Sequence, residues 1–157
     1  MKIYLFFFIY VFGFLSAFSQ VGINTSNPVS TLDINGNLSV KHVALTGAGS
    51  ATNINDGVYI SVNPSATNQE FKLPDPATVP GRVYFIRNVS SFTAKITMYG
   101  GVSKLFYFAK SWTGSSAQIY MYSSDSCGCT VADHPNNGNG YRSLIVLSDG
   151  SNWNVFN

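Results

Sequence analysis

The chain has 157 residues, of which 45% are hydrophobic and only 10% are charged, and its formal net charge is +2 at pH 7. A chain of this length can bury one sizeable core, so one main domain is expected. The net charge is too small to indicate a nucleic-acid partner. Low charge combined with abundant Asn, Ser, Thr and Gly is typical of extracellular β-rich proteins and unusual for a cytosolic enzyme.

The first 19 residues have the pattern of a secretory signal peptide. Lys2 supplies a positive charge, Ile3–Leu15 is almost wholly apolar, and the small residues Ala17 and Ser19 precede Gln20. This pattern predicts cleavage after Ser19 and a secreted or cell-surface location. The alternative is an uncleaved membrane anchor, but the apolar run is short for a span of about 20 residues. No other segment is apolar enough to cross a bilayer after cleavage.

Residues 20–45 are expected to form a separate N-terminal module. Leu32 and Ile34 alternate with polar residues, Asn35-Gly36 follows, and a second alternating run begins at Leu38. Asn-Gly between two alternating runs predicts a β-hairpin, because both residues tolerate a positive φ. The polar stretch Lys41–Asn55 is expected to be a loop or linker.

Residues 56–157 are expected to form a C-terminal β domain. Short runs rich in β-branched and aromatic residues are separated by turn residues, and no helical periodicity is sustained. We therefore predict an all-β fold, an antiparallel sandwich or a barrel. Two runs, Arg82–Val89 and Leu144–Leu147, carry apolar residues on both faces, which predicts cover on both sides by a second sheet or a neighbouring subunit. The expected strands are Gly57–Asn63, Glu70–Leu73, Arg82–Val89, Ala94–Tyr99, Lys104–Phe108, Gln118–Tyr122, Leu144–Leu147 and Asn152–Phe156, the last two joined as a terminal hairpin.

Two stretches carry a resemblance to known proteins. VGINTSNPVSTLDINGNLSV resembles an element of secreted proteins from Bacteroidetes-type bacteria and of phage tail fibres, with Asn24 where that element often has Gly. The matching residues are Val21, Gly22, Ile23, Thr25, Pro28, Leu32, Ile34 and Gly36. The second stretch, Phe71–Asn157, resembles a β domain at the C-terminal ends of tail-fibre-like and bacterial surface proteins. Here the matching residues are Leu73, Pro74, Ala77, Gly81, Arg82, Tyr84, Ile86, Asn88, Ser148, Asp149, Gly150 and Trp153. The resemblance implies a trimeric protein that binds surfaces or receptors.

Cys127 and Cys129 are separated by one residue, in a loop that the resemblance does not require. Exported thiols usually oxidise, which favours a disulfide. A bridge across one residue is strained, so partners on neighbouring subunits are an alternative. Metal binding with His134 and Asp133 is a further alternative, although zinc sites more often use Cys-x-x-Cys spacing. Free thiols are the remaining alternative.

Aromatic residues supply the candidate ligand-binding positions. An outward aromatic stripe can be formed by Tyr59, Tyr84, Tyr99, Tyr120 and Tyr122. Of these, Tyr59, Tyr99, Tyr120 and Tyr122 are the candidates for contact with a ligand. Such faces bind sugar rings and partner proteins. Ordinary cross-strand pairing beneath a subunit contact explains the same pattern.

No residues form a recognisable catalytic pattern. The carboxylates lie mostly in turns, where Asp caps its own backbone, and neither His42 nor His134 lies near a nucleophile motif. The sequence predicts no enzyme, no cofactor and no resident metal. It favours a fibre- or adhesin-like protein that binds a glycan or a surface protein, and the resemblance implies a homotrimer. A purely structural surface or matrix protein is the alternative.

Overall fold

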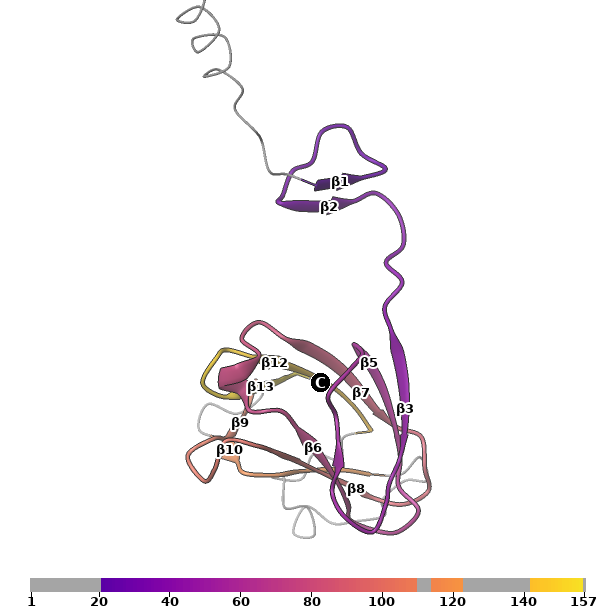
Figure 1. Cartoon of the computed structure of the whole chain (residues 1–157), viewed down its shortest axis with the longest axis vertical. Helices are drawn as coiled ribbons and strands as arrows, with labels where there is room; N and C mark the ends of the chain where they lie inside the picture. The colour runs from indigo at the N-terminus through magenta and orange to yellow at the C-terminus, as the bar shows by residue number, and fades with distance from the viewer. Residues whose placement is uncertain (1–20, 110–113, 123–141, 157) are drawn as a thin grey trace, which may run out of the picture. The chain divides into compact units, whose positions relative to one another are not determined.

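A computed structural model describes residues 21–109, 114–122 and 142–156 of the chain (Figure 1). These residues belong to two compact units, which divide between Ser39 and Val40. Apart from one short 3₁₀ helix, every regular element in the described part is a β-strand. The predicted all-β class is therefore confirmed.

The N-terminal unit is a pair of short strands, β1 (Val21–Ile23) and β2 (Leu32–Ile34), which run in parallel. The predicted hairpin at Asn35-Gly36 is wrong. The Asn35 N–H donates to the Ile23 carbonyl at 3.0 Å, and the Asn35 carbonyl accepts from Asn24 Nδ2 at 2.9 Å. Both backbone groups of Asn35 thus bind the β1 side, so they cannot pair across a turn to a following strand.

The second unit contains the β domain. Each of the eight predicted runs coincides with one strand, six of them inside the predicted bounds and two, Gln69–Leu73 and Ser143–Ser148, one residue longer at one or both ends. The expected loop Lys41–Asn55 instead contains two further strands, and the first of them extends the β domain into the range expected for the N-terminal module. The elements are β3 (His42–Thr46), β4 (Thr52–Asn53), β5 (Tyr59–Asn63), β6 (Gln69–Leu73), η1 (Pro76–Thr78), β7 (Val83–Asn88), β8 (Ala94–Met98), β9 (Phe106–Phe108), β10 (Ser115–Ser116), β11 (Ile119–Met121), β12 (Ser143–Ser148) and β13 (Trp153–Phe156).

From β3 to β8 the chain alternates between two sheets. Strands β3, β5 and β7 are parallel neighbours in a seven-stranded sheet, and β4, β6 and β8 are parallel neighbours in a four-stranded sheet. The chain thus winds as a flattened coil in which each turn contributes one strand to each sheet. The six strands from β3 to β8 make three such turns. The expectation of antiparallel sheets is wrong for this part, because coiling returns every strand to its sheet in the same direction.

Antiparallel pairs, together with one parallel pair between β13 and β9, complete the two sheets. Strand β12 pairs with β7 and, through the predicted terminal hairpin, with β13. On the other sheet β11 pairs with β8. The finished orders are β10-β9-β13-β12-β7-β5-β3 and β11-β8-β6-β4, so the fold is a sandwich of two mixed sheets.

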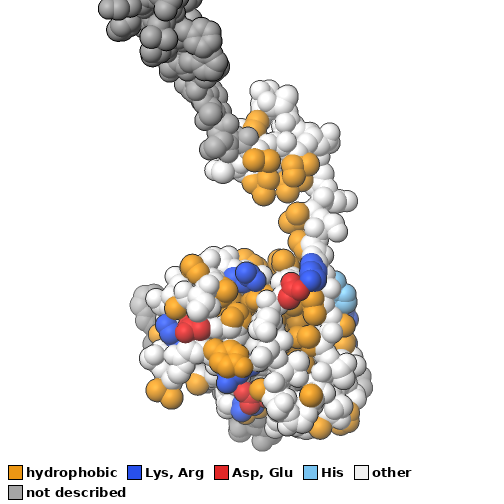
Figure 2. Space-filling view, viewed as in Figure 1, with side chains coloured by type: hydrophobic (Ala, Val, Ile, Leu, Met, Phe, Trp, Pro, Cys, Tyr) orange, Lys and Arg blue, Asp and Glu red, His pale blue; other side chains and the backbone are white. Residues whose placement is uncertain are grey.

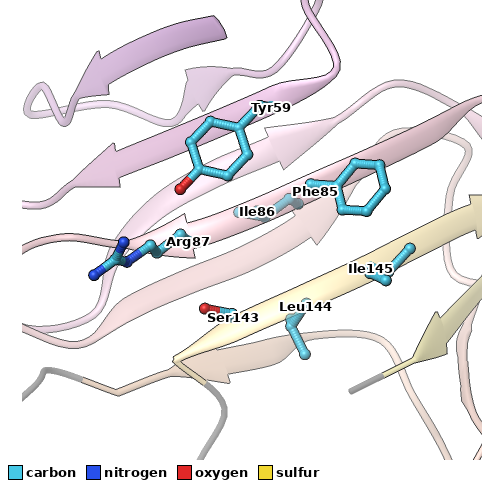
Figure 3. A pocket seen from close by; sticks show the side chains of 7 residues that line it. All are labelled: Tyr59, Phe85, Ile86, Arg87, Ser143, Leu144 and Ile145. Carbon is cyan, nitrogen blue, oxygen red and sulfur yellow. The ribbon is translucent and has the colours of Figure 1, made fainter. Parts of the chain in front are cut away.

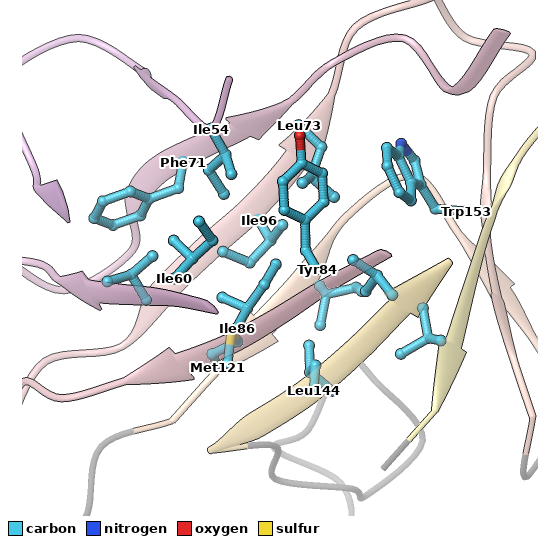
Figure 4. Packing of buried hydrophobic residues seen from close by; sticks show 14 of the residues in the cluster. Ile54, Ile60, Phe71, Leu73, Tyr84, Ile86, Ile96, Met121, Leu144 and Trp153 are labelled. Atoms are coloured by element: carbon cyan, nitrogen blue, oxygen red, sulfur yellow. The ribbon is translucent and has the colours of Figure 1, made fainter. Parts of the chain in front are cut away.

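The core lies between the two sheets (Figure 4). Strand alternation sends Tyr84 and Ile86 of β7 inward, where they are 0% and 1% exposed. The Tyr84 ring lies 5.7 Å from that of Trp153, whose indole N–H donates to the Pro74 carbonyl at 3.2 Å. Tyr84 is therefore a core residue, and its predicted place on an outward stripe is wrong. Because β7 carries apolar residues on both faces, the sequence pattern does not show which face points inward.

One buried amide joins the two sheets. Asn88 at the end of β7 is fully buried, and its Nδ2 donates to the carbonyls of Phe92, Met121 and Tyr122 at 2.8, 2.9 and 3.2 Å. Its Oδ1 accepts from the Ser90 N–H at 2.9 Å. A buried polar group is tolerated only when it is hydrogen-bonded, so this network fixes the end of β7 against β11.

Candidate functional site

The outer face of the seven-stranded sheet carries a row of apolar side chains. In the strand registers Tyr59 lies opposite Phe85, Phe85 opposite Ile145, and Ile145 opposite Phe156. Paired residues of adjacent strands point to the same side of a sheet, so these four side chains form one row across β5, β7, β12 and β13. The exposed fractions are 42% for Phe85, 38% for Ile145 and 42% for Phe156. The four-stranded sheet thus covers one face of β7 and β12 and leaves the other uncovered within the described chain.

A shallow hollow of about 260 Å³ opens along this row (Figure 3). The side chains of Tyr59, Phe85 and Ile145 supply apolar surface from three neighbouring strands. At one end Arg87 lies opposite Ser143 in the β7–β12 register and adds a cation and a hydroxyl. Arg87 forms no ion pair within the described residues. The full lining is Tyr59, Phe85, Ile86, Arg87, Ser143, Leu144 and Ile145.

His42 and Ser61 lie beside the hollow. The His42 ring packs against the Tyr59 ring in a tilted arrangement, with centroids 5.1 Å apart, and His42 Nε2 lies 2.9 Å from Ser61 Oγ. A Ser–His contact is a component of nucleophilic sites, but such a site also needs a group that orients the histidine and donors for an oxyanion. The described contacts of His42 include no carboxylate, and Ser61 is only 8% exposed. The pair therefore anchors β3 to β5. Sequence reasoning missed it, because the parallel register that brings residues 42 and 61 together leaves no local signal.

The predicted tyrosines do not share one face. Tyr59 lies on the seven-stranded sheet, whereas Tyr120 belongs to β11 and Tyr99 follows β8, both in the four-stranded sheet. The Tyr99 hydroxyl donates to Asn53 Oδ1 at 2.9 Å, and Lys72 Nζ lies 4.4 Å from the centre of its ring. Of the four candidates, only Tyr59 lines the hollow.

Hydrogen bonding and partial burial make Tyr120 and Tyr122 less accessible to a ligand. The Tyr120 hydroxyl accepts from Gln118 Nε2 at 3.1 Å. Burial raises the pKa of Tyr122, and the neighbouring Tyr120 adds to the rise. Both tyrosines are half-buried, so they offer less free surface than Phe85 does.

The outer face of the four-stranded sheet is polar and internally paired. Glu70 accepts from Thr97 Oγ1 at 2.6 Å and lies 3.7 Å from Lys95 Nζ. These contacts use the acceptors and donors that a ligand would otherwise meet. The seven-stranded sheet therefore offers the better candidate site.

The described part of the chain contains neither a cluster of metal ligands nor a membrane-spanning helix. Among residues 21–109, 114–122 and 142–156, no three His, Cys, Asp or Glu side chains lie close enough together to hold a metal ion. Those same residues include no helix that is long and apolar enough to cross a membrane. Cys127, Cys129 and His134 lie outside the described residues, as does the predicted signal peptide, so their predicted roles stay predictions.

Comparison with known proteins identified no similar protein. No family model matches the chain, and no curated protein and no solved structure shows significant similarity to it.

Proposed function

We propose that the chain is an exported, fibre- or adhesin-like binding protein that recognises a glycan or a protein surface through its β domain. The proposal includes cleavage of the signal peptide after Ser19, a secreted or cell-surface location, and a trimeric assembly. It assigns the outer face of the seven-stranded sheet as the contact surface.

The observation that carries the proposal is the hollow on that face. An open apolar surface next to a few polar groups is the usual composition of a recognition site. Tyr59 and Phe85 present aromatic surface, which packs on sugar rings and on apolar side chains alike. Arg87 and Ser143 can orient the ligand by hydrogen bonds. Within the described residues no carboxylate contacts the His42 ring, which favours binding over chemistry as the role of this face.

A purely structural surface or matrix protein remains the second candidate. The observation that favours it is the polar, internally paired outer face of the four-stranded sheet, where Glu70, Thr97 and Lys95 satisfy one another. In that case the apolar row would be covered permanently by neighbouring molecules, and no soluble ligand would bind.

The test is a binding measurement with matched variants. Exported protein would be applied to a glycan array and to cells with and without enzymatic removal of surface glycans. We expect Phe85→Ala and Ile145→Ala to weaken binding at least about tenfold, since each removes a central apolar contact. Val102→Ala is the control, because Val102 is 99% exposed and lies outside the row. Equal binding by all three variants, or no binding by the wild type, would contradict the proposal.

A further inference from the structure

Residues 21–39 form a hydrogen-bonded unit that has no core of its own. The Val21 N–H donates to the Thr31 carbonyl at 2.8 Å, and the Val29 N–H donates to Asp33 Oδ2 at 2.9 Å. Asn24 adopts a φ of 58°. Despite this defined geometry, no residue from 21 to 39 is buried. A two-stranded sheet with three pairs is at best marginally stable in water, so the unit needs cover from elsewhere.

One face of the β1–β2 ladder is covered by its own loop and the other is bare. A side chain at Gly22 would meet the Thr25 carbonyl at 2.6 Å and the Pro28 ring at 3.3 Å, so the connecting loop lies against that face. The opposite face carries Val21 and Ile23 from β1, with Leu32 and Ile34 beside them in register. Val21, Ile23 and Leu32 are 54%, 51% and 56% exposed. Figure 2 shows hydrophobic side chains gathered on one side of this unit.

Both edges of the ladder carry backbone groups that no further strand pairs within the described residues, although the Leu32 carbonyl accepts from Ser30 Oγ. Val21 and Ile23 direct their backbone groups toward β2, as the bonds to Thr31 and from Asn35 show. Backbone groups alternate in direction along a strand of a parallel ladder, so those of Gly22 point to the outer edge of β1. By the same alternation, Leu32 and Ile34 present backbone groups at the outer edge of β2.

We propose that residues 21–39 are the assembly element of the protein, and that the β1 edge of one copy pairs in parallel with the β2 edge of the next. Such a contact repeats the parallel pairing that already exists between β1 and β2. It joins two different edges, so it is heterologous, and it closes only as a ring of three or more copies. Closing the ring places the bare apolar faces together on the axis and leaves no open strand edge.

The charge of the unit favours a second copy over an unlike partner. Asp33 is the only charged residue between positions 21 and 39, and its carboxylate already accepts from the Val29 N–H. Identical copies therefore do not repel one another, and the unit presents no charge pattern that would select a different protein. The unit exposes apolar side chains and strand edges. A second copy exposes the same groups and can therefore cover them.

The test is the mass of the exported full chain in solution. Light scattering and native mass spectrometry should give the wild type at least three chain masses, and hydrogen exchange across residues 21–39 should be slow. The double variant Ile23→Asp/Leu32→Asp should have the mass of a single chain, fast exchange in that segment, and an unchanged urea midpoint for the β domain as followed by tryptophan fluorescence. Val29→Ser is the matched control, because Val29 is 91% exposed and lies outside the ladder, and it should assemble like the wild type.

Several results would overturn the inference. A monomeric wild type with slow exchange would mean that the chain's own β domain covers the module, and a wild-type dimer would exclude the ring. An assembly that survives the double substitution would assign oligomerisation to another surface. The inference rests on the proposed trimeric assembly and names the segment that forms it, but it does not depend on the proposed binding site. Phe85→Ala should lose ligand while it keeps the assembly mass, and the double variant reports on assembly alone.

Discussion

Phe85 and Ile145 face each other across the antiparallel β7–β12 pair, on the outer surface of the seven-stranded sheet, and both stay about two-fifths exposed. Their immediate neighbours Ile86 and Leu144 form the corresponding pair on the inner surface and are buried. Adjacent residues of the same strand thus belong to different surfaces: Phe85 and Ile145 to the candidate contact surface, and Ile86 and Leu144 to the core. Substitutions at these positions can therefore separate binding from stability.

We expect Ile86→Ala to lower the free energy of unfolding by about 2–5 kcal/mol, because it leaves a cavity between the sheets. Phe85→Ala should cost less, about 1 kcal/mol, since this side chain is 42% exposed and its loss leaves no enclosed cavity. Urea unfolding followed by tryptophan fluorescence would measure both. Similar losses for the two variants would mean that the outer face is covered within the folded chain.

The sequence predicts eight of the strands and the terminal hairpin between β12 and β13, but not the partners of the other strands. Alternation along Arg82–Val89 correctly indicates a strand with apolar residues on both faces. It does not say that Tyr84 and Ile86, and not Phe85, point inward, because both faces satisfy the same pattern. The direction of pairing is set by residues far away in the chain, so the parallel coil of β3 to β8 has no local signature.

The N-terminal module shows the same limit. Asn35-Gly36 has the composition of a hairpin turn, but the actual partner of β2 is β1, which precedes it. Asn24, which departs from the glycine common in the resembling element, has a positive φ of 58° and binds Asn35 through its side chain. Asn is among the few residues that adopt this conformation readily, so the departure preserves the backbone. Only the contact itself explains why the residue is Asn.

The Asn88 network should be essential for stability. Asn88→Ala removes the amide that serves the carbonyls of Phe92, Met121 and Tyr122. Unsatisfied buried acceptors carry a desolvation penalty, and we expect a loss of about 3 kcal/mol. Asn53→Ala is the control: Asn53 is exposed and accepts one described hydrogen bond, from Tyr99, so its loss should be below about 1 kcal/mol. Chemical denaturation of both variants tests this, and equal losses would argue against the network.

Asp149 should make stability depend on pH in the acid range. Hydrogen bonds from the Asn152 backbone, the Asn154 side chain and the Ser151 backbone lower the pKa of its carboxyl group below the ordinary 3.8. A carboxyl group whose pKa is lower in the folded state stabilises the fold above its unfolded pKa, and this contribution is lost as the pH falls through the folded pKa. Asp149→Ala should therefore lower the urea midpoint at pH 7 and have little effect near the acid end of the series. Asn154→Ala, which keeps the backbone donors, should show a smaller change of the same sign. A difference that stays constant at every pH would contradict this account.

Alanine substitutions at two turn glycines should distinguish the cost of backbone strain from the cost of steric contact. Gly57 and Gly81 have φ values of +77° and +75°, a region that disfavours side chains. A side chain at Gly81 would meet nothing within 4 Å, whereas one at Gly57 would meet Val43 Cγ2 at 2.7 Å and the Lys41 carbonyl at 3.2 Å. Gly81→Ala should thus cost about 1 kcal/mol from strain alone. Gly57→Ala should cost about 1–3 kcal/mol more, because the turn between β4 and β5 has to move away from β3.

Gly49→Ala, with no contact within 4 Å and no positive φ, is the neutral control. Thermal unfolding of the three variants orders them, and a Gly57→Ala variant as stable as Gly49→Ala would show that β3 does not pack against this turn.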